Sequence, residues 1–129
     1  MGRGPHLPDL LRRPYGLGRA PGRGRIVALT SDHTAHNLPY GASKGALDRI
    51  VLAAAREFAG LGVTANVINP GPVDNGWMAA PLKEQLTEAT PLGRLGLPRD
   101  CANLVGFLCS ERGGWINGQL LNSDGGVGS

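Results

Sequence analysis

Tyr40 and Lys44 are the residues of this sequence whose types and spacing most clearly suggest chemistry. Residues four apart on a helix project from the same face, so a helix through residues 40–44 would bring the phenol and the ammonium within reach of each other. A nearby ammonium stabilises a phenolate, which makes the tyrosine a better proton donor near neutral pH. The pair therefore predicts acid–base chemistry, although a surface tyrosine packed on a lysine stem has the same spacing.

The elements that must position this pair alternate between strand and helix. The predicted strands cover residues 26–30, 63–68 and 118–122. The predicted helices cover residues 41–60, 81–89 and 99–109. The first strand is a short β-branched apolar run, typical of a strand buried on both faces, and the helix at residues 41–60 is apolar around most of its surface. A strand, helix, strand, helix, strand order predicts an α/β protein with parallel strands.

Four motifs occur in a fixed order between residues 24 and 126. They are GRIVALTS at 24–31, PYGASKGAL at 39–47, VTANVINPGPV at 63–73, and INGQ at 116–119 followed by DGG at 124–126. Together they resemble the C-terminal half of the short-chain dehydrogenase/reductase family. The resemblance implies the last three strands of a Rossmann-like, doubly wound parallel sheet with their helices, without the N-terminal cofactor-binding half.

The resemblance also implies catalytic roles for three residues. Tyr40 would donate a proton to the substrate carbonyl in reduction, or act as the base in the reverse direction. Lys44 would assist Tyr40 and hold the ribose of the nicotinamide cofactor. Ser31, at the end of the first strand, would hydrogen-bond the substrate oxygen as charge develops there; a serine that caps a loop is the alternative interpretation.

A second set of residues would bind NAD or NADP by the same resemblance. Beside Tyr40 and Lys44, the expected contacts to the nicotinamide come from Pro70, Gly71, Val73 and Asn75. Asn75 stands where most family members have a threonine, and its side-chain amide could still hydrogen-bond the carboxamide. The choice between NAD and NADP depends on the half that has no counterpart here.

Residues 1–23 are rich in glycine, proline and arginine, and are expected to form a disordered leader ahead of the domain at residues 24–129. The glycines at residues 18–24 have GxxxGxG spacing, but a phosphate cradle needs a strand before it and a helix after it, and this run precedes a strand. The GxSxG spacing at residues 41–45 matches a hydrolase nucleophile motif, but it follows no strand, and every histidine precedes Ser43.

Charge and composition narrow the function classes. The leader carries five arginines against one aspartate, whereas the rest has eight basic and nine acidic residues and therefore no basic stripe for nucleic acid. No apolar run is long enough for a membrane span. Cys101 and Cys109 are expected to be buried free thiols in a cytoplasmic protein. Asp32, His33 and His36 lie in a polar loop without further ligands, so no metal site is predicted.

The resemblance therefore implies an NAD(P)-dependent oxidoreductase that reduces a carbonyl or oxidises an alcohol of a small molecule through Ser31, Tyr40 and Lys44. Because the cofactor half has no counterpart, we expect this chain to be inactive on its own. The alternative is a non-catalytic chain, either truncated or a structural partner of a complete homologue. The apolar helix at residues 41–60 predicts a homo-oligomer formed through that helix.

Overall fold

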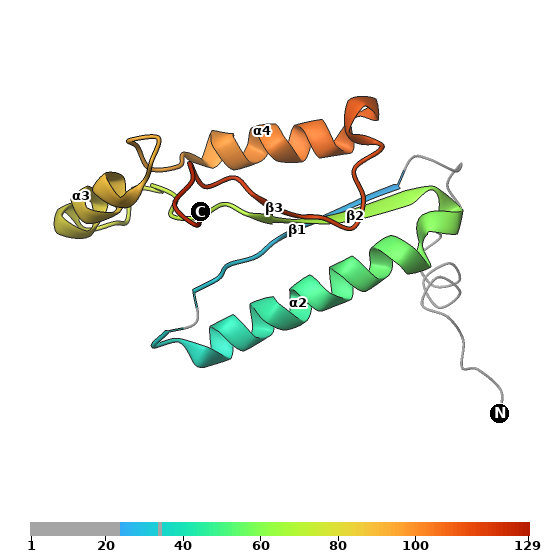
Figure 1. Cartoon of the computed structure of the whole chain (residues 1–129), viewed down its shortest axis with the longest axis horizontal. Coiled ribbons are helices and arrows are strands. Elements are labelled where there is room, and N and C mark those ends of the chain that lie inside the picture. The colour runs from blue at the N-terminus through green and yellow to red at the C-terminus, as the bar shows by residue number, and fades with distance from the viewer. Residues whose placement is uncertain (1–23, 34) are drawn as a thin grey trace.

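The computed structural model describes residues 24–33 and 35–129, and the leader predicted to be disordered, residues 1–23, lies outside them. In the described part, three parallel strands form one sheet in the order β1 (Gly24–Leu29), β2 (Val63–Asn69) and β3 (Leu120–Asn122). One face of the sheet is covered by α2 (Leu38–Glu57) and the other by α4 (Pro98–Cys109), whereas α3 (Ala80–Ala89) lies beyond one end of the sheet (Figure 1). The predicted α/β class and parallel sheet are confirmed.

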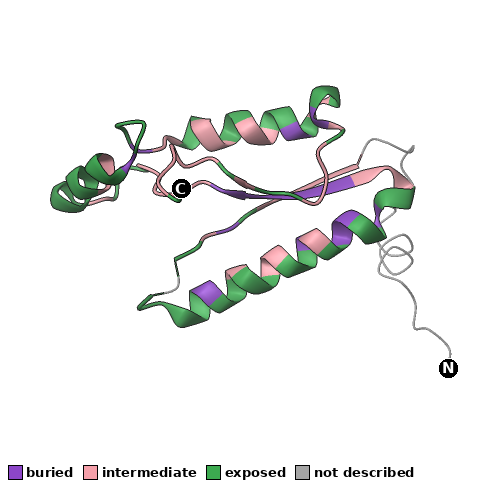
Figure 2. Ribbon diagram, viewed as in Figure 1, coloured by how far each residue is buried: buried purple, intermediate pink, exposed green. Residues whose placement is uncertain are grey.

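The central strand, β2, carries the core (Figure 2). Successive side chains of a strand point to opposite faces of the sheet. Ala65 and Val67 pack with Val51, Ala55 and Phe58 of the α2 side in the main hydrophobic cluster, and both are fully buried. Burial of apolar surface of this kind is the main force that holds α2 on the sheet.

The helix predicted at residues 41–60 begins earlier and ends earlier than expected. It starts at Leu38 because Pro39 occupies the first turn, where a missing backbone N–H costs no hydrogen bond. It ends at Glu57, and the 3-10 turn η1 (Ala59–Leu61) leads into Gly62, whose φ of 70° reverses the chain toward β2. The third strand is shorter than predicted, because Gly118, at a φ of 71°, still belongs to the turn that precedes it.

The prediction that the first strand is buried on both faces is wrong for the described structure. β1 is only half-buried, and Leu29 is 45% exposed. The physical reason is that β1 pairs with β2 along one edge, and no other described strand pairs with it. Its other edge presents backbone N–H and C=O groups that a further strand could pair with.

Two smaller expectations have different outcomes. Both cysteines are free, but Cys109 is exposed rather than buried, because it lies on the outer face of α4, whereas Leu108 beside it is buried. Burial raises the pKa of the partly buried Cys101 thiol.

Within residues 24–33 and 35–129, no helix is both long and apolar enough to cross a membrane.

Asn66 joins β2 to the segment that leads into β3. Its side chain is almost fully buried and donates from Nδ2 to the Ile116 carbonyl at 2.9 Å, while its Oδ1 accepts from the Gln119 amide at 3.0 Å. We expect Asn66→Ala to lower the free energy of unfolding by roughly 1–3 kcal/mol, because it removes both bonds and leaves two backbone groups without them. Urea unfolding followed by circular dichroism measures this, with Asn103→Ala on the exposed face of α4 as control. If Asn66→Ala and Asn103→Ala lowered the free energy of unfolding equally, the hydrogen bonds of the Asn66 side chain would not stabilise the fold as expected.

Candidate active site

The predicted site residues lie where the parallel strands end. Ser31 follows β1, Pro70 and Gly71 follow β2, and Asp124 follows β3. Parallel strands place their carboxyl ends at one edge of the sheet, which is where open α/β sheets bind ligands. The first turn of α2, with Tyr40, is reached from β1 by the short loop at residues 30–37.

Tyr40 and Lys44 are brought together as predicted. The Lys44 Nζ lies 5.7 Å from the centroid of the Tyr40 ring, and Tyr40 is 40% exposed. Lys44 also donates from Nζ to the Leu29 carbonyl at 3.1 Å, which ties the start of α2 to the last residue of β1. An ammonium has three protons to donate, so this bond leaves others for a ligand.

The hydroxyl oxygen of Ser31 accepts a hydrogen bond within its own loop. Its Oγ accepts a hydrogen bond from the His33 amide at 3.1 Å. The hydroxyl proton is therefore available for donation to another oxygen. His36, in the same loop, adopts a φ of 63°, and no group of three metal-binding side chains occurs in the described residues.

Gly71 is held in a conformation that requires glycine. Its φ is 61°, its amide donates to Asn69 Oδ1 at 3.1 Å, and a Cβ at this position would lie 2.6 Å from the Cβ of Asp124. Gly71, expected from the resemblance to contact the nicotinamide, is thus also approached closely by the turn after β3. Asp124 was not predicted as a site residue, and the signal that could have found it is the Asp-Gly-Gly run that it begins.

Val73 and Asn75 lie in the segment that follows the two prolines after β2. Val73 forms a parallel bridge with Gly96, and the Asp74 amide donates to the Gly96 carbonyl at 2.8 Å. The exposed Asn75 uses its Oδ1 to accept from the Trp77 amide at 3.2 Å, which leaves its NH₂ group to donate. An ion pair with Lys83 of α3 lowers the pKa of Asp74, chiefly through their hydrogen bond.

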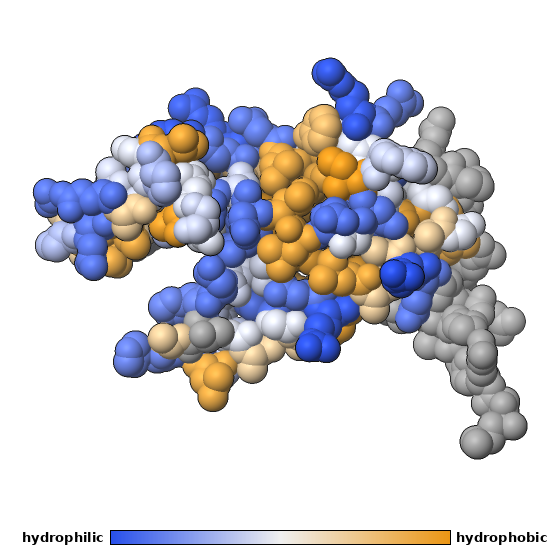
Figure 3. All heavy atoms as spheres, in the orientation of Figure 1, coloured by the Kyte–Doolittle hydropathy of each residue, from blue (hydrophilic) through white to orange (hydrophobic). Residues whose placement is uncertain are grey.

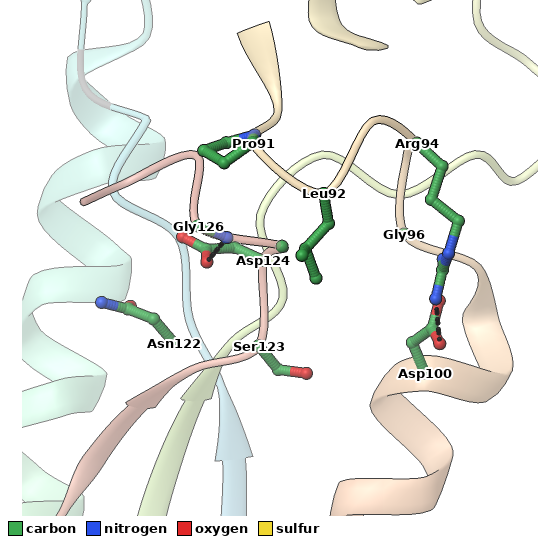
Figure 4. Close-up of a pocket in the computed structure, with 10 residues that line it drawn as sticks. Pro91, Leu92, Arg94, Gly96, Asp100, Asn122, Ser123, Asp124 and Gly126 are labelled. Carbon is green, nitrogen blue, oxygen red and sulfur yellow. Dashed lines mark hydrogen bonds and ion pairs between the residues drawn. The ribbon is translucent and has the colours of Figure 1, made fainter.

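An ion pair that was not predicted from the sequence joins Arg94 to Asp100 in the first turn of α4. Arg94 donates from Nη1 to Asp100 Oδ2 at 2.7 Å and from Nη2 to Asp100 Oδ1 at 3.0 Å (Figure 4). Asp100 Oδ2 also accepts from the Leu97 amide at 2.7 Å. The arginine, followed by this amide, lowers the pKa of Asp100 from 3.8 to about 2. The available signal was an acid in the third helical position, which is typical of a capped helix start.

This pKa shift predicts how the stability of the chain depends on pH. Because the pKa of Asp100 is lower in the folded chain than in the unfolded chain, where it is near 4, the ionised carboxylate stabilises the fold at pH values above about 4. This stabilisation is lost as the pH falls from about 4 to about 2 and the carboxylate becomes protonated. We expect Asp100→Asn to lower the melting temperature near pH 6 and to approach the parent chain near pH 2. Glu84→Gln, on the exposed part of α3, is the control. A constant difference between parent and Asp100→Asn across this range would contradict the prediction.

An open pocket of about 590 Å³ lies at the same end of the sheet but does not contain the predicted residues. It is formed between the loop at residues 91–96 and the turn after β3, with Leu92 and Ser123 among its lining residues (Figure 4). None of Ser31, Tyr40 and Lys44 lines it. The pocket and the Tyr40 and Lys44 pair are therefore separate features of this end of the sheet.

Sequence comparisons match most of the chain to known oxidoreductases. Residues 15–128 match the family model described as Enoyl-(Acyl carrier protein) reductase. An uncharacterized oxidoreductase of Bacillus subtilis is 40% identical over 107 residues, which are 80% of this chain and 43% of that protein. A chloroplastic NADPH-dependent aldehyde reductase-like protein of Arabidopsis thaliana is 39% identical over 113 residues, which are 81% of this chain and 42% of that protein.

Solved structures agree with this match. An angucycline C-6 ketoreductase with bound NADP superposes with a TM-score of 0.73 at 34% identity, over 83% of this chain and 44% of that one. A short-chain type dehydrogenase/reductase from Mycobacterium ulcerans has a TM-score of 0.74 at 32% identity, over 82% of this chain and 42% of that one. The chain thus spans less than half the length of each of these relatives.

Proposed function

Because the chain belongs to the short-chain dehydrogenase/reductase family, we propose that it provides the catalytic half of an oxidoreductase that moves a hydride between NAD or NADP and a small carbonyl or alcohol. The observation that carries the proposal is the Tyr40 and Lys44 pair, with Lys44 tied to the end of β1. An exposed phenol beside an ammonium, at the carboxyl edge of a parallel sheet, has the arrangement that proton transfer to a bound substrate requires.

The residues present fit the nicotinamide end of such a cofactor. Lys44 retains protons for ribose hydroxyls, and Asn75 retains an amide donor for a carboxamide oxygen. Pro70 and Gly71 directly follow β2, a few residues before Asn75. The bound nicotinamide would supply or accept the hydride, which side chains alone cannot do. NADP is bound in the ketoreductase named above, and NADPH stands in the name of the Arabidopsis relative, so both support a nicotinamide cofactor without deciding which one.

The side chains of this chain would handle the proton and the developing charge. During reduction Tyr40 would donate its phenol proton to the carbonyl oxygen, and Ser31 would donate a hydrogen bond to the same oxygen. Lys44 would stabilise the phenolate that remains on Tyr40. Donors aimed at an oxygen that gains charge stabilise the transition state more than the ground state.

Association with further protein is part of the proposal. The exposed side of α2 carries Ala42, Ala46, Ile50 and Ala53, a stripe of small residues with one large apolar side chain. Small residues let helices approach closely, so this stripe supports a homo-oligomer formed through α2.

On the face drawn in Figure 3, hydrophobic side chains also gather between α4 and α2, over the edge of the sheet. The edge of β1 with which no described strand pairs favours the second candidate, a non-catalytic partner of a complete homologue.

Fusion to a cofactor-binding half tests the proposal. Residues 24–129 would be joined to the part of the Arabidopsis relative that this chain does not match, and the oxidation of NADPH and NADH would be followed with a panel of aldehydes and ketones. We expect carbonyl-dependent oxidation by the fusion. The chain alone should show none and should bind neither cofactor at micromolar concentrations. A folded fusion that binds a cofactor but reduces none of the panel would favour the non-catalytic role.

A further inference from the structure

The Arg94 and Asp100 ion pair fixes a short segment to the start of α4. The guanidinium and the carboxylate meet through two parallel hydrogen bonds, a geometry that is both strong and directional. Arg94 Nη1 also donates to the Leu95 carbonyl at 3.0 Å, and the Leu97 amide donates to Asp100. Residues 94–97 are therefore held at both ends by the same pair.

This segment pairs with the segment that follows β2. The Gly96 amide donates to the Pro72 carbonyl at 3.2 Å, and the Gly96 carbonyl accepts from the Asp74 amide at 2.8 Å. The approach is close, because a Cβ at Gly96 would lie 3.3 Å from the Pro72 carbonyl oxygen. A larger residue at position 96 would push the two segments apart.

The segment after β2 has few other anchors of its own. Pro70 and Pro72 have no backbone N–H to donate. The Gly71 amide is bound locally by Asn69 Oδ1, and the backbone of Asp74 is fixed from outside its own segment by the pairing with Gly96, while its carboxylate is paired with Lys83 of α3. Val73 and Asn75, on either side of Asp74, therefore depend on Gly96 for the position of their backbone, beside the side-chain contact of Asp74 with Lys83.

We propose that Arg94 and Asp100 are positioning residues that hold Val73 and Asn75 in place against the nicotinamide. The inference rests on the proposed function, which assigns Val73 and Asn75 to the cofactor. The pair acts through Leu97 and Gly96 and does not touch the reacting atoms. Gly71 is held separately by Asn69 and by the turn at Asp124, so loss of the ion pair should displace residues 73–75 and leave Gly71 in place.

Amide hydrogen exchange on the chain itself tests the coupling. In Arg94→Ala we expect the Asp74 and Gly96 amides to exchange at least about tenfold faster, while the amides of Gly71 and Ile68 keep their rates. Arg94→Lys, which keeps one charged donor, should fall between the parent and Arg94→Ala. Arg112→Ala, at an exposed position of the 3-10 turn η2 (Glu111–Gly113), is the control. Unchanged exchange at Asp74, or an equal increase at Ile68, would overturn the coupling.

Kinetics of the fusion test the positioning role. A displaced cofactor contact should raise the KM for the nicotinamide cofactor by about tenfold and change kcat by less than about threefold. Arg94→Lys should recover part of the affinity. Faster exchange at Asp74 with an unchanged KM would reduce the pair to a structural role and overturn the inference. An inactive parent fusion would instead overturn the proposed function, and the exchange measurement separates the two failures because it needs no cofactor.

Discussion

Replacing Tyr40 with phenylalanine is expected to lower turnover of the fused oxidoreductase by about 100- to 10,000-fold, the range typical of a lost general acid. The ring and its contact with Lys44 remain, and only the proton donor is removed. Cofactor affinity should therefore change by less than about threefold. Steady-state oxidation of the reduced cofactor gives the first value, and fluorescence titration gives the second.

A matched control lies one helical turn away. The Ser43 hydroxyl donates to the Tyr40 carbonyl at 2.7 Å and has no role in the proposed chemistry. Ser43→Ala should keep turnover within about threefold of the parent. Near-parent turnover in Tyr40→Phe, or an equal loss in both variants, would show that the phenol is not the proton donor.

Gly71→Ala is expected to produce the largest loss of stability among single methyl additions at this edge of the sheet. Alanine at a φ of 61° costs about 1–2 kcal/mol, and overpacking adds about 1–3 kcal/mol, because the new Cβ would lie 2.6 Å from the Cβ of Asp124. The total loss in the free energy of unfolding is thus about 2–5 kcal/mol. Urea unfolding of the fusion measures it.

Gly93→Ala separates the two causes of this loss. Gly93 also has a positive φ, 77°, but a Cβ there would have no heavy atom within 4 Å. Its substitution should cost only the backbone part, about 1–2 kcal/mol. If both variants lost the same amount of stability, the contact between Gly71 and Asp124 would not be a real constraint.

The parts of the fold that could be predicted from the sequence are those with strong local patterns. The apolar run of β2 ends at Pro70, and its expected bounds differ from the observed strand by one residue, because proline cannot continue the pairing. The proximity of Tyr40 and Lys44 follows from helical spacing alone, so that part of the candidate site was predictable.

The remaining contacts depend on tertiary structure. Gly71 contacts Asp124, and Gly96 contacts Pro72. These residues are far apart in the sequence, and the periodicity of a helix or strand does not predict contacts over such distances. The partner of Lys44 was likewise unpredictable, because a backbone carbonyl such as that of Leu29 carries no sequence signal. The burial of β1 was overestimated, because an apolar run shows only that a strand is suited to burial. Whether the strand is in fact buried depends on the elements that pack around it.

The most direct measurement follows the hydride itself. NADPH or NADH carrying deuterium at the C4 position of the nicotinamide would be given to the fusion with an accepted carbonyl substrate, and the product alcohol would be examined by mass spectrometry. If this chain completes a short-chain oxidoreductase, the deuterium of one of the two C4 faces appears on the carbinol carbon, and Tyr40→Phe reduces the rate at which it appears. An alcohol without deuterium from either face, or labelled product formed at the parent rate by Tyr40→Phe, would contradict the account.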